Sequence, residues 1–336
     1  MRTSHLRNGG LPLLALVLLA GCGGPPDGVT APPAGVQPAS YTPGQSYFGR
    51  NRYVEYIAGN APVILSAPHG GDLTPDEIPD RTAESCGGTA TVGRDLNTRE
   101  LVVAMQRRYF ARFGSYPHVV VNHLHRSRMD ANRELLEAAC GDVEAGVAWR
   151  EFHDFLTTAR NAVVRTRGRG WYMDMHGHGH PFQRLELGYL LRDDQLDLSD
   201  ARLDAYRAYE DTSSIRTISA QATRLSFSAL LRGAGSLGTL YASRGFPAVP
   251  SSTFPSSAEG EAYFSGGYNT ARHTCGAEAG PLGGATHGAI CGVQIEANYT
   301  GVRDTQANMD RFGDVTAEVL DSYLTLHWGL DLDVVP

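Results

Sequence analysis

Four polar clusters in this chain of 336 residues combine histidines, carboxylates and arginines. A hydrolytic metal site requires imidazole and carboxylate ligands, an open position for water, a separate carboxylate to move protons, and cations to hold an anionic substrate. The clusters contain all of these groups, so their residue types favour a metal-dependent hydrolase. They are SAPHGGD (66–72), HRSRMDANR (125–133), DMHGHGH (174–180) and QIEANY (294–299).

Each cluster lies at the end of a segment with the pattern of a buried β-strand. Short apolar or β-branched runs predict strands at 62–67, 118–122, 170–175, 186–191 and 291–297. Longer periodic runs predict a helix to 113 capped by Asn97 or Thr98, a helix to 165 capped by Asp142, mainly helical structure at 199–231, and a long amphipathic helix after 297. Strands alternating with helices indicate an α/β domain, and ligands bind at the carboxyl ends of strands in such sheets.

The motifs, in their order along the chain, resemble the N-formylglutamate amidohydrolase family, which is related to the zinc carboxypeptidases. The resemblance rests on Pro68-His69-x-Gly71, Asp95, Asp130-Ala-Asn-Arg133, Asp174-x-His176 and Glu296, and it extends from about Ala61 to Tyr299. It implies a three-layer α/β/α fold with a central mixed β-sheet, of the zinc-carboxypeptidase and phosphorylase/hydrolase-like type. The longer runs around these motifs look like a secreted branch of the family.

By this resemblance, His69 and His176 are the imidazole ligands of one Zn²⁺, and other divalent transition metals suit the same donors. The third ligand is Asp95, with Asp72 as the alternative because His69-Gly-Gly-Asp72 imitates the carboxypeptidase spacing. Either aspartate can instead cap a helix or turn. Asp174 shares a strand face with His176, so we expect it to fix the tautomer of that imidazole.

The same resemblance makes Glu296 the general base, because a carboxylate in an apolar strand needs a chemical or an ion-pairing reason to be there. It also assigns Arg133, beside Asn132, to the catalytic site as the group that holds a substrate carboxylate. The alternative for the arginines is that they are ordinary solvent-exposed charges. The alternative for His178 and His180 is that they are histidines of a glycine-rich loop that form hydrogen bonds and take no part in chemistry. The further substrate-binding candidates are Arg128, Arg184 and His178, with Arg126 weighed beside Arg128.

The N-terminus has the features of an export signal. Arg2 and Arg7 precede a short apolar run at 11–20, which ends in Leu19-Ala20-Gly21-Cys22. This ending resembles a bacterial lipobox, which implies lipidation of Cys22; a plain signal peptide is the alternative. The sequence thus predicts a lipoprotein signal at 1–21, a Gly/Pro-rich tether at 22–45 and a single hydrolase domain at 46–336, anchored at the periplasmic or extracellular side of a bacterial envelope.

Four further cysteines, an even number in an exported chain, predict two disulfides with three connectivities open. Their short separations in sequence favour the pairs Cys86–Cys140 and Cys275–Cys291.

The net charge of −7, without a Lys/Arg-rich block, argues against nucleic acid as a partner. We therefore expect a zinc-dependent amide hydrolase that acts on a small carboxylate-bearing amide or peptide and touches the membrane only through its anchor. Export argues against N-formylglutamate itself and favours a peptide, an N-acyl amino acid or a cell-wall fragment. The alternatives are a non-catalytic binding lipoprotein that retains the fold, and an envelope protein that captures several metals with its histidines. The oligomeric state stays open.

Overall fold

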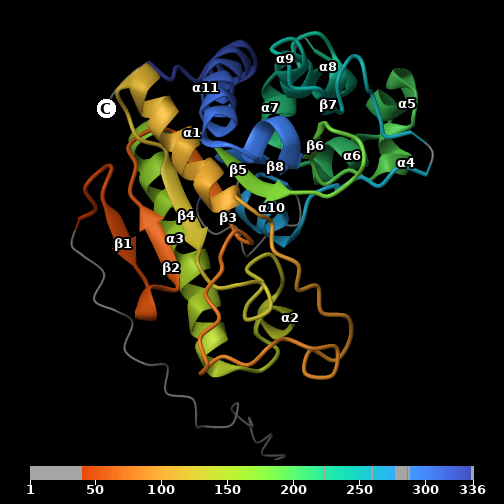
Figure 1. Ribbon diagram of the computed structural model, residues 1–336. Helices are drawn as coiled ribbons and strands as arrows, with labels where there is room; N and C mark the ends of the chain where they lie inside the picture. The colour runs from red at the N-terminus through yellow and green to blue at the C-terminus, as the bar shows by residue number, and fades with distance from the viewer. Residues whose placement is uncertain (1–39, 223–224, 259, 277–285, 287, 334–336) are drawn as a thin grey trace, which may run out of the picture. The chain divides into compact units, whose positions relative to one another are not determined.

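Eight strands form one mixed sheet in the described part of the chain (Figure 1). The computed structural model describes residues 40–222, 225–258, 260–276, 286 and 288–333. The strand order across the sheet is β1-β2-β4-β3-β5-β8-β6-β7. The strands are β1 (Ser46–Phe48), β2 (Val54–Ile57), β3 (Val63–Ala67), β4 (His118–Asn122), β5 (Gly170–Gly177), β6 (Leu185–Gly188), β7 (Ala248–Val249) and β8 (Ile290–Ala297).

The four central strands, β4, β3, β5 and β8, are mutually parallel. They are buried along almost their whole length, which explains why they read as apolar runs rather than as a strict alternation. Towards the edges β2 pairs antiparallel to β4, and β6 pairs antiparallel to β8. The carboxyl ends of the central strands therefore meet at one edge of the sheet, where the polar clusters of the sequence lie.

Helices cover both faces of the sheet, which confirms the predicted three-layer α/β architecture. Helices α1 (Thr98–Phe113) and α11 (Gln306–Trp328) lie side by side over one face, and α3 (Val143–Arg167) covers the other (Figure 1). The Asp142 side chain caps α3 by accepting a hydrogen bond from the Ala145 N–H, as predicted. Asn97 does not cap α1; it has a left-handed backbone, and its side chain donates to the Arg303 carbonyl instead.

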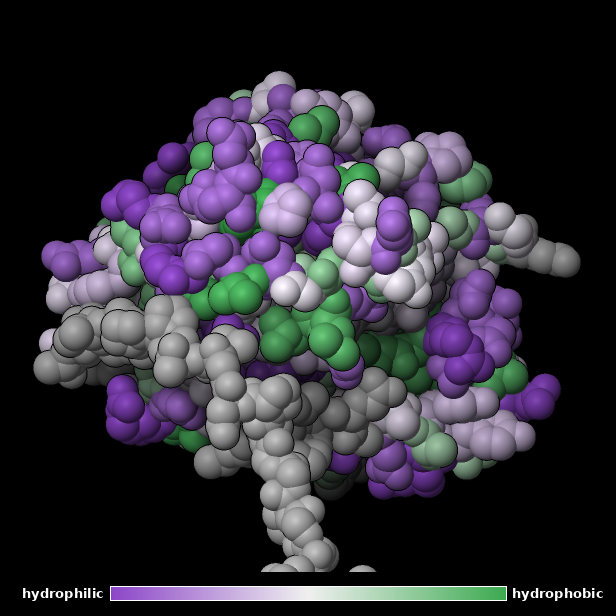
Figure 2. Space-filling model, turned by 90° about the horizontal axis from the view of Figure 1, so that it is seen from below, coloured by the Kyte–Doolittle hydropathy of each residue, from purple (hydrophilic) through white to green (hydrophobic). Residues whose placement is uncertain are grey.

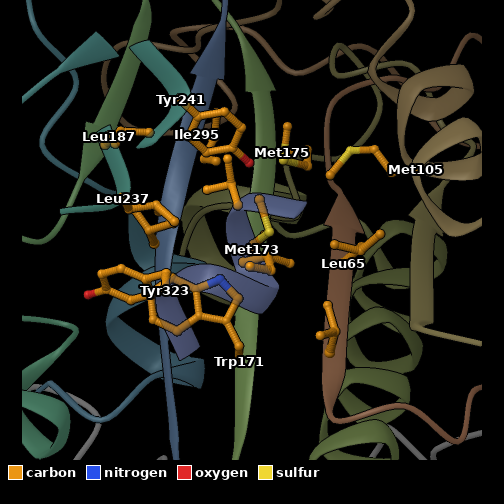
Figure 3. Close-up of a cluster of buried hydrophobic side chains, with 14 of the residues drawn as sticks. Leu65, Met105, Trp171, Met173, Met175, Leu187, Leu237, Tyr241, Ile295 and Tyr323 are labelled. Atoms are coloured by element: carbon orange, nitrogen blue, oxygen red, sulfur yellow. The ribbon is translucent and has the colours of Figure 1, made fainter. Parts of the chain in front are cut away.

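Alternate residues of β5 divide the strand between two environments. Trp171, Met173 and Met175 point into a large apolar cluster beneath α1 and α11, together with Leu65 and Ile295 (Figure 3). Asp174 and His176 occupy the intervening positions and so face the opposite side of the sheet. Packing of the apolar side chains on one face of β5 thus holds Asp174 and His176 in position on the other face.

Short helices fill the connections between the main elements. Most follow β6 and account for the predicted helical stretch around 199–231. They are α2 (Leu135–Ala139), α4 (Asp193–Leu196), α5 (Asp200–Ala205), α6 (Arg207–Thr212), α7 (Arg216–Gln221), α8 (Phe227–Arg232), α9 (Leu237–Ala242) and α10 (Tyr268–His273). Seen from the side of α2, apolar side chains meet near the middle of a face with hydrophilic residues around them (Figure 2).

The structure contains both disulfides favoured by the sequence, Cys86–Cys140 and Cys275–Cys291. The first joins the loop after β3 to the end of α2, and the second joins the chain beyond α10 to β8.

The folded domain begins before residue 46. Gly44 donates a backbone hydrogen bond to Ala58, and the Tyr41 ring packs against Tyr47 and Tyr56. Residues 41–45 were assigned to the tether by the sequence and instead lie against the sheet. The predicted signal at 1–21, the lipidation site Cys22 and most of the tether lie outside the described residues.

Among the helices of the described ranges, none has both the length and the apolar character needed to cross a membrane.

Candidate metal centre and cavity

Three residues expected to hold a metal converge at the carboxyl ends of β3 and β5. His69 follows β3 directly, His176 lies near the end of β5, and Asp95 lies in the loop that leads into α1. The backbone N–H of Asp95 donates to the His69 carbonyl at 3.0 Å, which ties this loop to the strand end. Gly71 permits the approach of the neighbouring strand, since a Cβ there would lie 2.3 Å from the carbonyl carbon of His123.

The ligating atoms of these three residues lie within 4.8 Å of one another. Oδ2 of Asp95 is 3.2 Å from Nδ1 of His176 and 3.4 Å from Nδ1 of His69. All three side chains are buried or nearly so. Two imidazoles and one carboxylate are the donor set of many catalytic zinc sites, which keep a further position open.

Each imidazole has a second carboxylate on its far nitrogen. Nε2 of His69 lies 2.6 Å from Oδ1 of Asp130, and Nε2 of His176 lies 2.9 Å from Oδ2 of Asp174. An ionised carboxylate only accepts hydrogen bonds, so Nε2 of each ring carries a proton. Nδ1 of each ring then points at Oδ2 of Asp95, on the side where a metal would bind. Carboxylates in this position orient metal-binding histidines and raise their basicity.

The charges and hydrogen bonds around the three residues fit a bound cation. Nδ1 of His69 is buried and forms no hydrogen bond within the described residues. Burial would lower the pKa of His176, but the carboxylates of Asp174 and Asp95 outweigh burial and raise it well above the usual value. Burial would also raise the pKa of Asp95, yet the two imidazoles hold it well below the usual range. This donor set therefore fits Zn²⁺ or a related transition metal.

Glu296 lies beside this group on β8, opposite His176 in the strand register. Its Oε1 is 4.0 Å from Nδ1 of His176 and accepts a 3.0 Å hydrogen bond from Nε2 of Gln294. Burial raises the pKa of Glu296 to about 8; His176 opposes this shift, and Asp95 adds to it. A carboxylate with a pKa near neutrality can both accept and return a proton.

These groups line a cavity of about 260 Å³. Arg126, Asn132 and Arg133 contribute to the same wall, so three of the candidate polar side chains in the 125–133 cluster face one space. Nε of Arg126 is held by Asp130 at 2.9 Å, and Nε of Arg133 by Glu137 at 2.9 Å. The cavity thus combines two fixed cations, the candidate metal ligands and one buried carboxylate.

The structure places other candidates away from this cavity. Asp72 is half exposed and pairs with Arg99 at 3.0 Å, so Asp95, not Asp72, joins the two histidines. Arg128 donates to the Ile78 carbonyl and lies 3.5 Å from Asp80.

Arg184 is also remote from the metal ligands. It pairs with Glu261 and lines a separate cavity of about 390 Å³, with Phe182 and Phe254 near its guanidinium group. His178 donates from Nε2 to the Arg184 carbonyl and accepts from the His180 N–H at Nδ1, so both of its ring nitrogens are engaged.

His178, His180 and Glu186 form a second group whose ligating atoms lie within 4.8 Å of one another. Nδ1 of His180 lies 2.7 Å from Oε1 of Glu186, and the His180 ring stacks on Phe264. Burial lowers the pKa of His178, so that ring is neutral. This group lies next to the first, because Glu186 on β6 pairs in register with Glu296 on β8.

The roles of several residues at the site were not predicted from the sequence. Asp130 was recognised only as part of a motif, although its position two residues before Asn132 and four after Arg126 marks a polar turn. Gln294 is two residues before Glu296 on a strand, and that spacing alone predicts that both side chains share a face. The wall at 263–267 had no sequence signal, and its hydrogen bond to Gln294 comes from the backbone N–H of Gly267.

No known family profile matches the chain, and no curated protein sequence matches it. Among solved structures, the crystal structure of an N-formylglutamate amidohydrolase from Ralstonia eutropha JMP134 is similar, with 13% sequence identity and a TM-score of 0.43. The match covers 79% of this chain and 97% of that chain. A likeness this distant does not assign an activity.

Proposed function

We propose that this protein is a metal-dependent amide hydrolase, with His69, Asp95 and His176 as the ligands of one zinc ion and Glu296 as the general base. The observation that carries the proposal is the pair of carboxylates, Asp130 and Asp174, on the Nε2 atoms of the two histidines. They direct Nδ1 of both rings toward Asp95, and Nδ1 of His69, which is buried and has no hydrogen bond within the described residues, would gain a partner from a cation bound there.

A zinc ion held by His69, Asp95 and His176 would lower the pKa of water to about 7 and polarise a carbonyl oxygen. In the proposed reaction Glu296 takes a proton from water as the water oxygen attacks the amide carbon. The same carboxyl group then gives this proton to the leaving nitrogen as the C–N bond breaks. Amide and water thereby become a carboxylic acid and an amine, and the general base is returned to its starting state.

The size and charge of the cavity favour a small anionic substrate. Its volume of about 260 Å³ is near the lower end for ligand pockets, so it suits an N-acyl amino acid or a short peptide end rather than a long polymer. Arg133 and Arg126 line it and suit a carboxylate, since a guanidinium fork matches that group. Asn132 accepts the Asn269 N–H at Oδ1, so its amide nitrogen points the other way, 3.3 Å from Nε2 of His176.

The first experiment measures zinc per chain in the purified domain and its turnover on N-formyl and N-acyl amino acids before and after chelation. Glu296→Gln should keep the metal and lower kcat by roughly 10²–10⁴, because the amide is nearly isosteric but cannot move the proton. Glu210→Gln is the matched control, since this buried glutamate pairs with Ser219 and Arg207 and does not line the cavity. We expect its kcat within about threefold of the wild type.

Metal-bound wild-type protein without turnover on any amide, or Glu296→Gln with full activity, would overturn the hydrolase proposal. Tight binding of the same compounds without hydrolysis would instead support a binding lipoprotein that retained the site.

We also propose that the protein is exported and anchored through Cys22 at the bacterial envelope. Two disulfides are typical of an oxidising compartment, and the sequence around Cys22 resembles a lipobox. Full-length wild type should sediment with membranes, whereas Cys22→Ala should remain in the supernatant. Equal distribution of both proteins would contradict the anchor.

A further inference from the structure

Gln294 makes a direct hydrogen bond to the carboxylate proposed as the general base. It lies on β8, two residues before Glu296 and on the same face, and both side chains line the cavity. Its Nε2 is 3.0 Å from Oε1 of Glu296, and its side chain is buried. Of the hydrogen bonds within the described chain, this is the one that reaches the Glu296 carboxylate.

The orientation of the Gln294 amide is fixed from its other end. Oε1 accepts a 2.7 Å hydrogen bond from the backbone N–H of Gly267. A backbone N–H can only donate, so the amide oxygen must face Gly267 and the amide nitrogen must face Glu296. The group therefore donates to Glu296 and cannot flip without breaking both bonds.

The segment around Gly267 is itself closely held. A Cβ at Gly267 would lie 2.5 Å from Nδ2 of Asn132, so the backbone touches this side chain directly. The next turn begins α10, where the Asn269 N–H donates to Oδ1 of Asn132 at 2.8 Å. Beyond α10, the Cys275–Cys291 disulfide joins the same chain to β8, the strand that carries Gln294. The donor to Gln294 is thus tied to the strand on which Gln294 lies.

We propose that Gln294 is a positioning residue for the hydrolysis: anchored by Gly267, it holds Oε1 of Glu296 and leaves Oε2 to exchange the proton with water. This inference rests on the proposed function. A buried carboxylate without this donor would have rotamers that turn it away from the reacting atoms, and small displacements of a catalytic group reduce rate strongly. The effect should therefore appear in kcat and act only through Glu296.

The test is Gln294→Met, which keeps the length of the side chain and removes both hydrogen bonds. We expect kcat to fall by about 10- to 100-fold, with KM changed by less than about threefold and zinc content unchanged. Gln294→Glu keeps an acceptor for Gly267 but loses the donor to Glu296, so it should not rescue kcat. Gln106→Met is the matched control, because Gln106 is a buried glutamine of α1 whose Nε2 donates to the Pro117 carbonyl. It should lower thermal stability and leave kcat within about twofold.

A double-mutant cycle separates positioning from a general structural role. In the Glu296→Gln background, Gln294→Met should lower the residual rate by less than about twofold, since its target has already lost its function. A full additional loss, a change confined to KM, or Gln294→Met with wild-type kcat would overturn the inference while Glu296→Gln still reports on the hydrolase. If instead Glu296→Gln were fully active, the proposed function would fail, and the role of Gln294 with it.

Discussion

Two neighbouring groups of this protein have the same kinds of residues and different surroundings. His69, Asp95 and His176 form one, and His178, His180 and Glu186 form the other; each brings two imidazoles and a carboxylate within 4.8 Å. They lie next to each other at the end of the sheet, because His176 on β5 and Glu186 on β6 are both in register with Glu296 on β8, and His178 follows His176 by two residues. The types of ligating atoms and the distances between them are therefore the same for the two groups and do not show which group binds a metal.

The hydrogen bonds distinguish them. In the first group both Nε2 atoms are taken by carboxylates outside the group, and the Nδ1 atoms face Asp95. In the second group, both nitrogens of His178 are satisfied by backbone groups of Arg184 and His180. A metal there would have to break bonds that already stabilise the loop, whereas Nδ1 of His69 in the first group is buried and has no hydrogen bond to any part of the chain that the structure describes. The comparison predicts one metal per chain, in the first group.

The largest expected effect is loss of the metal from the first group alone. His69→Ala and His176→Ala should each reduce bound zinc from about one ion per chain to nearly none, because two donors do not hold zinc stably. His178→Ala should retain it. Elemental analysis of dialysed protein measures this, and a His178→Ala protein without metal would reverse the assignment of the two groups.

Next in size is the contrast between two aspartates. Asp95→Ala should deplete zinc because it removes a ligand that lies between both imidazoles. Asp72→Ala should keep zinc and cost little stability, since Asp72 is an exposed partner of Arg99. Zinc content and melting temperature, measured for both variants, show which aspartate is the third ligand. Loss of metal from Asp72→Ala alone would identify Asp72, at the carboxypeptidase-like spacing from His69, as that ligand.

A smaller effect is expected from the carboxylates behind the histidines. Asp130→Asn and Asp174→Asn should each weaken zinc affinity by about 10- to 100-fold, because the ring loses a partner that fixes its tautomer. Glu186→Gln, which alters the carboxylate of the second group, should not change zinc affinity. Competition with a chromogenic chelator provides the affinities. Unchanged zinc affinity in both aspartate variants would show that these carboxylates do not orient the histidines for metal binding.

The smallest effect is expected at His180. His180 is partly exposed but Glu186 is buried, so His180→Ala leaves a buried carboxylate without this partner and should cost about 1–3 kcal/mol of unfolding free energy, with zinc content and kcat/KM nearly unchanged. Denaturant unfolding and steady-state kinetics measure the two quantities. A second zinc equivalent bound by the wild type and lost in His180→Ala would reveal a second metal site.

The sequence by itself determined the four central strands and β6, the main helices and the residue types of the site, whereas the short edge strands β1, β2 and β7 had no clear signal. Apolar runs such as 118–122 and 291–297 predicted buried strands because burial on both faces leaves no room for alternation. The apolar stripe of α3 and its Asp142 cap could also be predicted, because both depend on residues that are close together in the sequence. Strand periodicity also placed Asp174 on the face of His176.

The tertiary structure alone decided which polar groups meet. Asp72 is three residues from His69 and points to Arg99, whereas Asp95, 26 residues from His69 along the chain, reaches both histidines because the loop before α1 folds back on β3. The sequence favoured Arg184 over Arg126 as a cation for the substrate, but the packing of their loops placed Arg126 in the cavity and Arg184 outside it. Hydrogen bonds from backbone groups, such as Gly267 to Gln294, leave no trace in residue type, because every non-proline residue carries the same donor.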